Sequence, residues 1–179
     1  MKTGTAAKRY AKALFGLTRD QGQLDTVRSD LVSLRGLLDE SAEFRDFIES
    51  PLIPPEQRKD LLGQILGDTA HPKTHQFLLF LDEKGRLELL GGICDLFEAL
   101  YDELNGIVKV DIISASGLNE TQVTAIEARL QARLDKQIQS TVALDPTVLG
   151  GFKVRIGDTI LDYSIATQLK ALRRRLLTT

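Results

Sequence analysis

Two short strand patterns followed at once by an amphipathic helix, in residues 150–176, constrain this chain more than any other stretch. Strand-like runs at Phe152–Ile156 and Thr159–Tyr163 flank the dipeptide Gly157-Asp158. Two turn residues between alternating runs predict a tight β-hairpin, and the order Gly-Asp puts glycine at the central position that needs a positive φ. A glycine pair before the first strand predicts a bulge or a sharp strand entry. The predicted structural turn residues are therefore Gly150, Gly151, Gly157 and Asp158.

A helix follows the hairpin directly. Ser164 ends the second strand, and its hydroxyl can accept an N–H group of the first helical turn. Asp162 can stabilise the same helix N-terminus electrostatically. Apolar residues then recur at helical spacing in one stripe, which consists of Ile165, Leu169, Leu172 and Leu176. The stretch is thus predicted to be a β-hairpin joined to a C-terminal amphipathic helix.

Six helical patterns occupy the chain before this point. Each shows apolar residues at spacings of three and four, and glycine, serine or proline separates one from the next. Their apolar faces fall within residues 7–15, 24–38, 44–48, 61–66, 77–81 and 87–101. Six helices with short connections predict an N-terminal six-helix bundle over residues 1–105, which is an ordinary size for one domain.

The pattern changes after Asn105-Gly106, where we place the domain boundary. Residues 108–112 alternate apolar and charged side chains and predict a strand. Asn119 and Gln122 resemble a capping box at the start of a helix, and residues 141–144 predict a second strand. With the hairpin and the last helix, these elements predict a small C-terminal α/β domain over residues 106–179.

Composition excludes several classes of protein. The chain has 179 residues, a formal net charge of −2 and a single cysteine, so neither general nucleic-acid binding nor an intrachain disulfide is expected. No apolar run approaches the ~20 residues that span a bilayer. The basic, amphipathic start of the chain is rich in Lys and Ala rather than Ser and Arg. We therefore expect it to belong to the mature fold of a bacterial protein that faces the cytosol.

No residue pattern predicts catalysis, a cofactor or a metal ion. His71 and His75 lie four residues apart, but Pro72 stands between them and no nearby residue completes a ligand set. Cys94 falls on the apolar stripe of the sixth helix, and no histidine in the second half of the chain can serve as its base. The glycines near residue 150 flank a strand and lack the Gly-Lys-Ser/Thr of a phosphate loop. Cys94 is predicted to be a core residue.

The C-terminal stretch resembles a known family. Its pattern Gly-Gly-Phe-x-x-Arg-Ile-Gly-Asp-x-x-x-Asp-x-Ser-Ile, followed by leucines at helical spacing, is similar to the C-terminal signature of the delta subunit of bacterial F-type ATP synthases. The mitochondrial equivalent is the oligomycin-sensitivity-conferring protein. The resemblance implies a non-catalytic stator subunit that links the catalytic head to the peripheral stalk, so that proton flow drives ATP synthesis. It also implies a peripheral location at the cytoplasmic face of the bacterial cell membrane, with membrane association only through the complex and no small-molecule ligand.

Two helices of the bundle carry wider apolar faces than one core requires, and such helices need a second partner. The resemblance supplies the partner: the N-terminal segment of an alpha subunit, bound between the first and fifth helices. The expected alpha-subunit contacts are Ala6, Tyr10, Ala13, Leu14, Leu17, Phe77, Leu78 and Leu81. The alternative is that all of these residues belong to the bundle core.

The resemblance assigns the C-terminal domain to the b subunits of the peripheral stalk. The expected contacts are Phe152, Ile165, Leu169, Leu172 and Leu176. A different reading rests on the basic run Arg173–Arg175, which would suit a nucleic-acid or regulatory binding module. Binding that weakens steeply with salt would favour that reading, because phosphate contacts release counterions.

Overall fold

The computed structural model describes residues 4–50, 53–67, 70–148 and 150–177, without the side chains of residues 55, 171, 172 and 175–177. Its contacts divide the chain into two compact units, Met1–Tyr101 and Asp102–Thr179. This division falls inside the last turn of a helix, slightly before the boundary at residue 105 expected from the sequence. Asp102, the first residue of the second unit, pairs its carboxylate with Lys109 at 2.9 Å.

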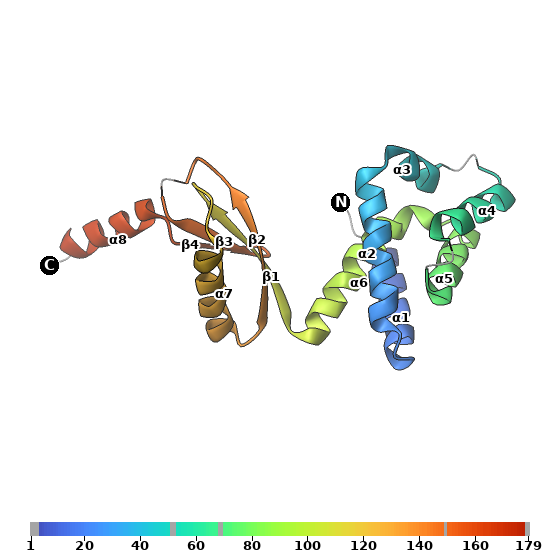
Figure 1. Ribbon diagram of the computed structural model, residues 1–179, viewed down its shortest axis with the longest axis horizontal. Coiled ribbons are helices and arrows are strands. Elements are labelled where there is room, and N and C mark those ends of the chain that lie inside the picture. Colours follow the sequence, from blue (N-terminus) through green and yellow to red (C-terminus); the bar gives the residue numbers. More distant parts are fainter. Residues whose placement is uncertain (1–3, 51–52, 68–69, 149, 178–179) are drawn as a thin grey trace. The chain divides into compact units, whose positions relative to one another are not determined.

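The N-terminal unit is the predicted helical bundle (Figure 1). Its helices are α1 (Thr5–Asp20), α2 (Leu24–Glu40), α3 (Ala42–Glu49), α4 (Pro55–Leu66), α5 (Pro72–Glu83), the 3₁₀ turn η1 (Leu87–Leu89) and α6 (Leu90–Asn105). The turn η1 departs from the sequence prediction, which has a single helix from Arg86. Gly85 has a φ of +61°, and Arg86 N–H donates to Leu81 O at 2.8 Å, so the chain turns tightly before α6 begins.

The bundle has one continuous apolar core. Phe97 of α6 is fully buried and meets Phe15 of α1 edge to face, with 5.4 Å between the ring centroids. Leu31 and Ile93 are buried beside them. Burying each such side chain contributes roughly 1.5–3 kcal/mol relative to leaving it exposed, so this core is a large favourable contribution to the stability of the bundle.

Cys94 lies in this core, as predicted, and is 4% exposed. Burial raises the pKa of its thiol to about 12, so about one molecule in 10⁴ carries a thiolate at pH 8. We expect the native chain not to react with an aromatic disulfide reagent at pH 8 and to react stoichiometrically in denaturant. Absorbance of the released thiolate measures both rates. Rapid labelling of the folded chain would contradict this burial.

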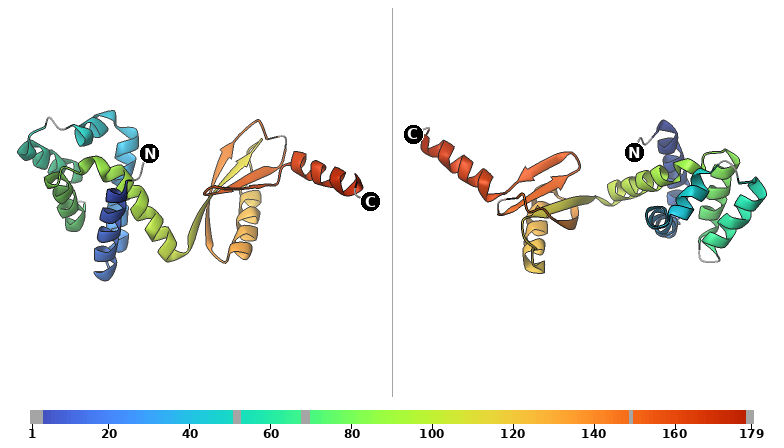
Figure 2. Two further views of the ribbon diagram at one scale, coloured as in Figure 1. Left: turned by 180° about the vertical axis from the view of Figure 1, so that it is seen from behind. Right: turned by 90° about the horizontal axis from the view of Figure 1, so that it is seen from above.

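The C-terminal unit is a mixed sheet with one helix on it. Its elements are β1 (Ile107–Ser114), α7 (Glu120–Leu134), β2 (Gln137–Leu144), β3 (Phe152–Ile156), β4 (Thr159–Asp162) and α8 (Ile165–Leu177). The strand order is β2-β1-β3-β4; β1 and β2 are parallel, and the other pairs are antiparallel. Helix α7 makes the crossover that a parallel pair requires. Both views in Figure 2 show α7 against one face of the sheet.

Helix α7 and the sheet enclose a small core. The sheet residues Val110, Ile112 and Val154 pack in one cluster with Ile126 and Leu130 of α7, and all five are buried. The helix begins at the predicted capping box: Gln122 N–H donates to Asn119 Oδ1 at 2.8 Å, and Asn119 N–H donates to Gln122 Oε1 at 3.0 Å.

Strand β2 is longer than the sequence predicts. It begins at Gln137, four residues before the expected start, and pairs with β1 along its whole length, from Ile107↔Gln137 to Ser114↔Leu144. The strand lies at the edge of the sheet, and most of its side chains are exposed. An edge strand with few buried positions shows little apolar alternation, and for this reason the sequence pattern does not predict the first half of β2.

Candidate functional site

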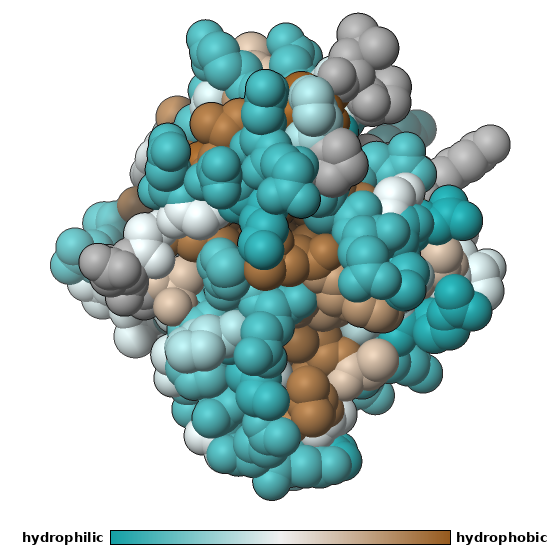
Figure 3. Space-filling model, turned by 90° about the vertical axis from the view of Figure 1, so that its right-hand side faces the viewer, coloured by the Kyte–Doolittle hydropathy of each residue, from teal (hydrophilic) through white to brown (hydrophobic). Residues whose placement is uncertain are grey.

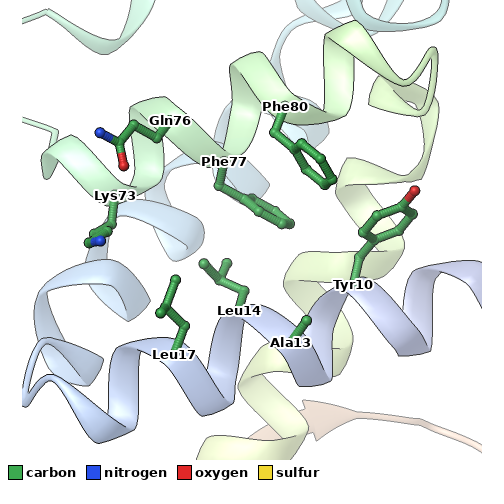
Figure 4. A pocket seen from close by; sticks show the side chains of 8 residues that line it. All are labelled: Tyr10, Ala13, Leu14, Leu17, Lys73, Gln76, Phe77 and Phe80. Atoms are coloured by element: carbon green, nitrogen blue, oxygen red, sulfur yellow. The ribbon is translucent and has the colours of Figure 1, made fainter.

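A hollow of about 260 Å³ lies between α1 and α5 in the N-terminal unit. Figure 4 shows side chains from the two helices facing one another across it. The lining residues are Tyr10, Ala13, Leu14, Leu17, Lys73, Gln76, Phe77 and Phe80. We call this hollow the α1/α5 groove. The sequence predicts an apolar surface between these two helices, and the structure places the groove there.

The groove has a buried floor and exposed rims. Leu14 is only 3% exposed and forms the floor, whereas Leu17 and Phe80 are 46% and 42% exposed on opposite walls. Tyr10 and Phe80 approach edge to face across one end, with 6.1 Å between ring centroids. Small Ala13 between these larger side chains leaves room for another backbone to approach. The groove can therefore accept an apolar helical ridge.

Basic side chains lie beside the groove, and one of them, Lys84, pairs with Glu83 at 2.9 Å. The Arg9 guanidinium lies 5.6 Å from the Tyr10 ring centroid, and Lys84 Nζ lies 5.6 Å from that of Phe80. Lys73 lines the groove itself, and none of the described residues that line it is acidic. An occupant with acidic residues beside its apolar stripe would be favoured electrostatically.

Helix α5 is tied to the bundle at both ends. At its start, Asp30 of α2 accepts hydrogen bonds from His71 N–H at 2.8 Å and Thr74 Oγ1–H at 2.6 Å. Near its end, Asp82 pairs with Arg58 of α4 at 2.9 Å, and these side chains are only 10% and 13% exposed. The two anchors fix the helix that forms one wall of the groove.

The structure places the expected alpha-subunit contacts differently relative to the groove. Tyr10, Ala13, Leu14, Leu17 and Phe77 line the groove, and Ala6 does not. Leu78 and Leu81 are fully buried in the bundle core and do not line the groove.

Phe80 lines the α5 wall of the groove, although it is not among the expected contacts. It lies one turn after Phe77 on the groove side of α5, and that spacing could have identified it. The apolar side chains of this unit are not all buried: a hydrophobic strip reaches the surface on the face shown in Figure 3.

In the C-terminal unit, the glycine pair holds the start of α8. Gly150 and Gly151 have φ values of +72° and +75°. A Cβ atom on Gly151 would lie 2.6 Å from Tyr163 O, and one on Gly150 would lie 2.7 Å from Ile165 Cδ1. Ile165 N–H donates to Gly150 O at 3.1 Å. The glycines therefore let the loop before β3 lie directly against the junction between β4 and α8.

Two polar side chains complete this junction. Ser164 Oγ accepts the N–H of Thr167 at 3.3 Å, which is the predicted cap. Asp162 Oδ1 accepts the N–H of Ser164 at 2.8 Å. Hydrogen bonds from Ser164 lower the pKa of the Asp162 carboxyl, which stays ionised at neutral pH near the helix N-terminus.

The first two residues of the apolar stripe of α8 are exposed. Ile165 and Leu169 are 51% and 60% exposed, while the side chains of Leu172 and Leu176 lie outside the described residues. Phe152, by contrast, packs partly against the core under α7, with its ring 5.2 Å from that of Tyr163. Of the expected b-subunit contacts, Ile165 and Leu169 are exposed on α8, whereas Phe152 is a partly buried residue at the start of β3.

Comparison with known proteins identifies the family. The family model described as "ATP synthase delta (OSCP) subunit" matches residues 6–176. The chain belongs to this family. It is 36% identical over 177 residues to the ATP synthase subunit delta of Chlorobium phaeobacteroides, covering 99% of this chain and 98% of that one. The corresponding subunit of Chlorobaculum tepidum gives the same identity and coverage.

A solved structure agrees over nearly the whole length. A chain in the cryo-EM structure of the Toxoplasma gondii mitochondrial ATP synthase hexamer matches with a TM-score of 0.74 and 31% identity. The match covers 97% of this chain and 98% of that chain. The bundle followed by a small mixed sheet is therefore the fold of a delta/OSCP subunit.

The delta/OSCP subunit is a non-catalytic stator part of the F-type ATP synthase, which serves ATP synthesis and proton transport. His71 caps α5, its Nδ1 accepting the N–H of Lys73 at 3.2 Å. Within the described ranges, no group of side chains could hold a metal ion. None of the helices described there is long and apolar enough to cross a membrane.

Proposed function

We propose that this delta/OSCP subunit binds the amphipathic N-terminal segment of an alpha subunit in the α1/α5 groove and the b subunits of the peripheral stalk through its C-terminal unit. It thereby keeps the catalytic head from turning with the central rotor. The complex holds it peripherally at the cytoplasmic face of the bacterial membrane. The observation that supports the proposal is a mainly apolar groove with a buried floor and exposed rims between two helices.

The dimensions of the groove suit a helix. Its α1 wall runs from Tyr10 to Leu17, which is about 10 Å of helix at 1.5 Å per residue. Two turns of a partner helix would place apolar anchors over this length at helical spacing. The phenylalanines on the α5 wall are large apolar surfaces of the kind that dominate such contacts.

The test uses a synthetic peptide with the sequence of the alpha N-terminal segment and the full-length chain. We expect the peptide to bind and to gain helicity. Leu17→Glu should weaken binding by at least about tenfold, because one charged group would face an apolar ridge without a partner. Calorimetry measures the affinity and circular dichroism the helicity. Leu17 is preferable to Leu14, since a carboxylate at the buried Leu14 would unfold the bundle itself.

Val32→Glu is the matched control. Val32 lies on α2, is 50% exposed and does not line the groove. We expect this variant to bind the peptide as the unmodified chain does. If both variants lose affinity equally, or if the unmodified chain ignores the peptide at high micromolar concentration, the groove is not the binding site.

A further inference from the structure

Strand β2 forms an outer edge of the sheet and has none of the features that usually protect such an edge. Its open side pairs with no strand in the described part of the chain. The eight residues Gln137–Leu144 include no charged residue and no proline, and the register with β1 is continuous, so no bulge interrupts the strand. Edge strands are normally short, charged or bulged, because their unpaired backbone groups can join another strand.

The opposite edge of the sheet has the protection that β2 lacks. Strand β4 spans only the four residues Thr159–Asp162 and ends on a charged side chain. An incoming strand therefore meets a short, charged edge at β4 and a long, uncharged edge at β2. Of the two edges, β2 is the one that is open to pairing.

The hydrogen bonds at the two ends of β2 show which of its backbone groups are open. Gln137 N–H donates to Gly106 O at 2.9 Å, and Asp145 N–H donates to Ser114 O at 2.9 Å. Both donors face β1, and successive residues of a strand direct their backbone groups to alternate sides in the plane of the sheet. The even-numbered residues of β2 therefore present their N–H and C=O groups at the open edge, and these residues are Ile138, Ser140, Val142 and Leu144.

Two of these residues also offer apolar side chains beside the open edge. Val142 pairs with the buried Ile112 of β1, so its side chain lies on the face of the sheet that carries α7. Leu144, two residues further along, points to the same face. Val142 and Leu144 are nevertheless 39% and 66% exposed. A strand added at β2 would bond to the backbone and cover these side chains at once.

The sequence of β2 matches a second, antiparallel copy of itself. With a twofold axis at Thr141, Ile138 lies opposite Leu144 of the second copy. Ser140 then lies opposite Val142 in the same way. All four of these residues have their open backbone groups on the pairing edge, as bonded antiparallel pairs require. An axis at Ser140 would leave Leu144 without an apolar partner, so the apolar pattern favours the axis at Thr141.

We propose that the chain, outside the ATP synthase complex, forms a twofold dimer through β2, in which two four-stranded sheets join into one. A second copy is the favoured occupant because its edge has the same length and the complementary order of apolar residues. A net charge of only −2 on each chain opposes this association weakly. The edge is separate from the α1/α5 groove and from the residues expected to contact b subunits, so the dimer does not depend on the proposed function.

Cysteines placed on β2 of the full-length chain test the register. In the twofold pair, Thr141→Cys sets two cysteines opposite each other with about 4.5 Å between their Cα atoms, which suits a disulfide. Ala143→Cys is the matched control on the same face, where the two cysteines are offset by about 13 Å along the strands. With oxidised glutathione, Thr141→Cys should form covalent dimers at least about tenfold faster. Non-reducing electrophoresis measures both rates, and the buried Cys94 does not compete.

A second pair of variants tests the edge without an added cysteine. Sedimentation equilibrium of the unmodified chain should give a mass that rises with concentration from one chain toward two. Leu144→Lys should weaken this association by at least about tenfold, because a charge enters each of the two apolar contacts. Ile160→Lys is the matched control: Ile160 is 59% exposed on β4, and its replacement should change the association by less than about twofold.

Three results would overturn the β2 dimer. The first is the mass of a single chain at every concentration up to the high micromolar range. The second is an equal loss of association in Leu144→Lys and Ile160→Lys, which would place the contact on another surface. The third is cross-linking of Ala143→Cys as fast as that of Thr141→Cys, which would mean that the cysteines meet by chance encounter and not in the twofold pair.

Discussion

Gly151→Ala should destabilise the C-terminal unit by about 3 kcal/mol or more, because two penalties add at this position. Its φ of +75° strains any L-residue, typically by about 1–2 kcal/mol. The added methyl group would also lie 2.6 Å from Tyr163 O and 3.1 Å from Ser164 Cα. These are backbone atoms of the junction that starts α8, so no side chain can rotate away to relieve the clash.

Gly157→Ala separates the two penalties. Gly157 in the hairpin turn has a φ of +56°, but a Cβ atom there would meet nothing within 4 Å. We expect a loss of about 1–2 kcal/mol from conformational strain alone. Because the chain has two units, urea unfolding should be followed at the amide signals of β1 and β3 by NMR rather than by a whole-chain probe. Equal losses in the two variants would show that the close approach at Gly151 is tolerated.

Local patterns in this sequence predict local structure well. The hairpin at Gly157-Asp158, the capping box at Asn119 and the Ser164 cap each depend on residues within a few positions of one another, and all three form as predicted. Each is specified by turn or cap chemistry that acts within one or two turns of the chain. The family resemblance rests on this same local signature.

The groove shows where sequence reasoning falls short. Helix α5 is apolar on more than one side, and periodicity alone cannot tell the core side from the open side. Phe80 and the two leucines Leu78 and Leu81 all belong to the apolar face that the sequence predicts, and only the position of α1 decides which of them line the groove. The glycine pair shows the same limit. The sequence predicts an unusual backbone conformation there, but the close approach of Gly151 to Tyr163 O depends on tertiary packing. Such features need the packed structure.

Asp82→Ala should cost the N-terminal unit about 3 kcal/mol, the lower end of the range for breaking a buried ion pair. The Asp82 and Arg58 side chains are 10% and 13% exposed, so removing the carboxylate leaves a guanidinium in a site with little water. Arg58 also donates to Ser50 O at 2.6 Å and Ile53 O at 3.2 Å, and thus ties the segment before α4 to α5. Urea unfolding followed at the amide signals of α2 and α5 by NMR measures the loss in this unit.

The same change should weaken binding of the alpha peptide, because Asp82 lies two residues after Phe80 and fixes the end of the groove wall. Glu83→Ala is the matched control: Glu83 pairs with Lys84 at 2.9 Å in an exposed pair, and such pairs contribute about 0–1 kcal/mol. Replacing the buried pair by Arg58→Met with Asp82→Leu should recover most of the stability, since no buried charge then remains unpaired. If Asp82→Ala lowers stability no more than Glu83→Ala does, the Arg58–Asp82 pair does not anchor α5. The polar anchor of this groove wall is then the one at Asp30.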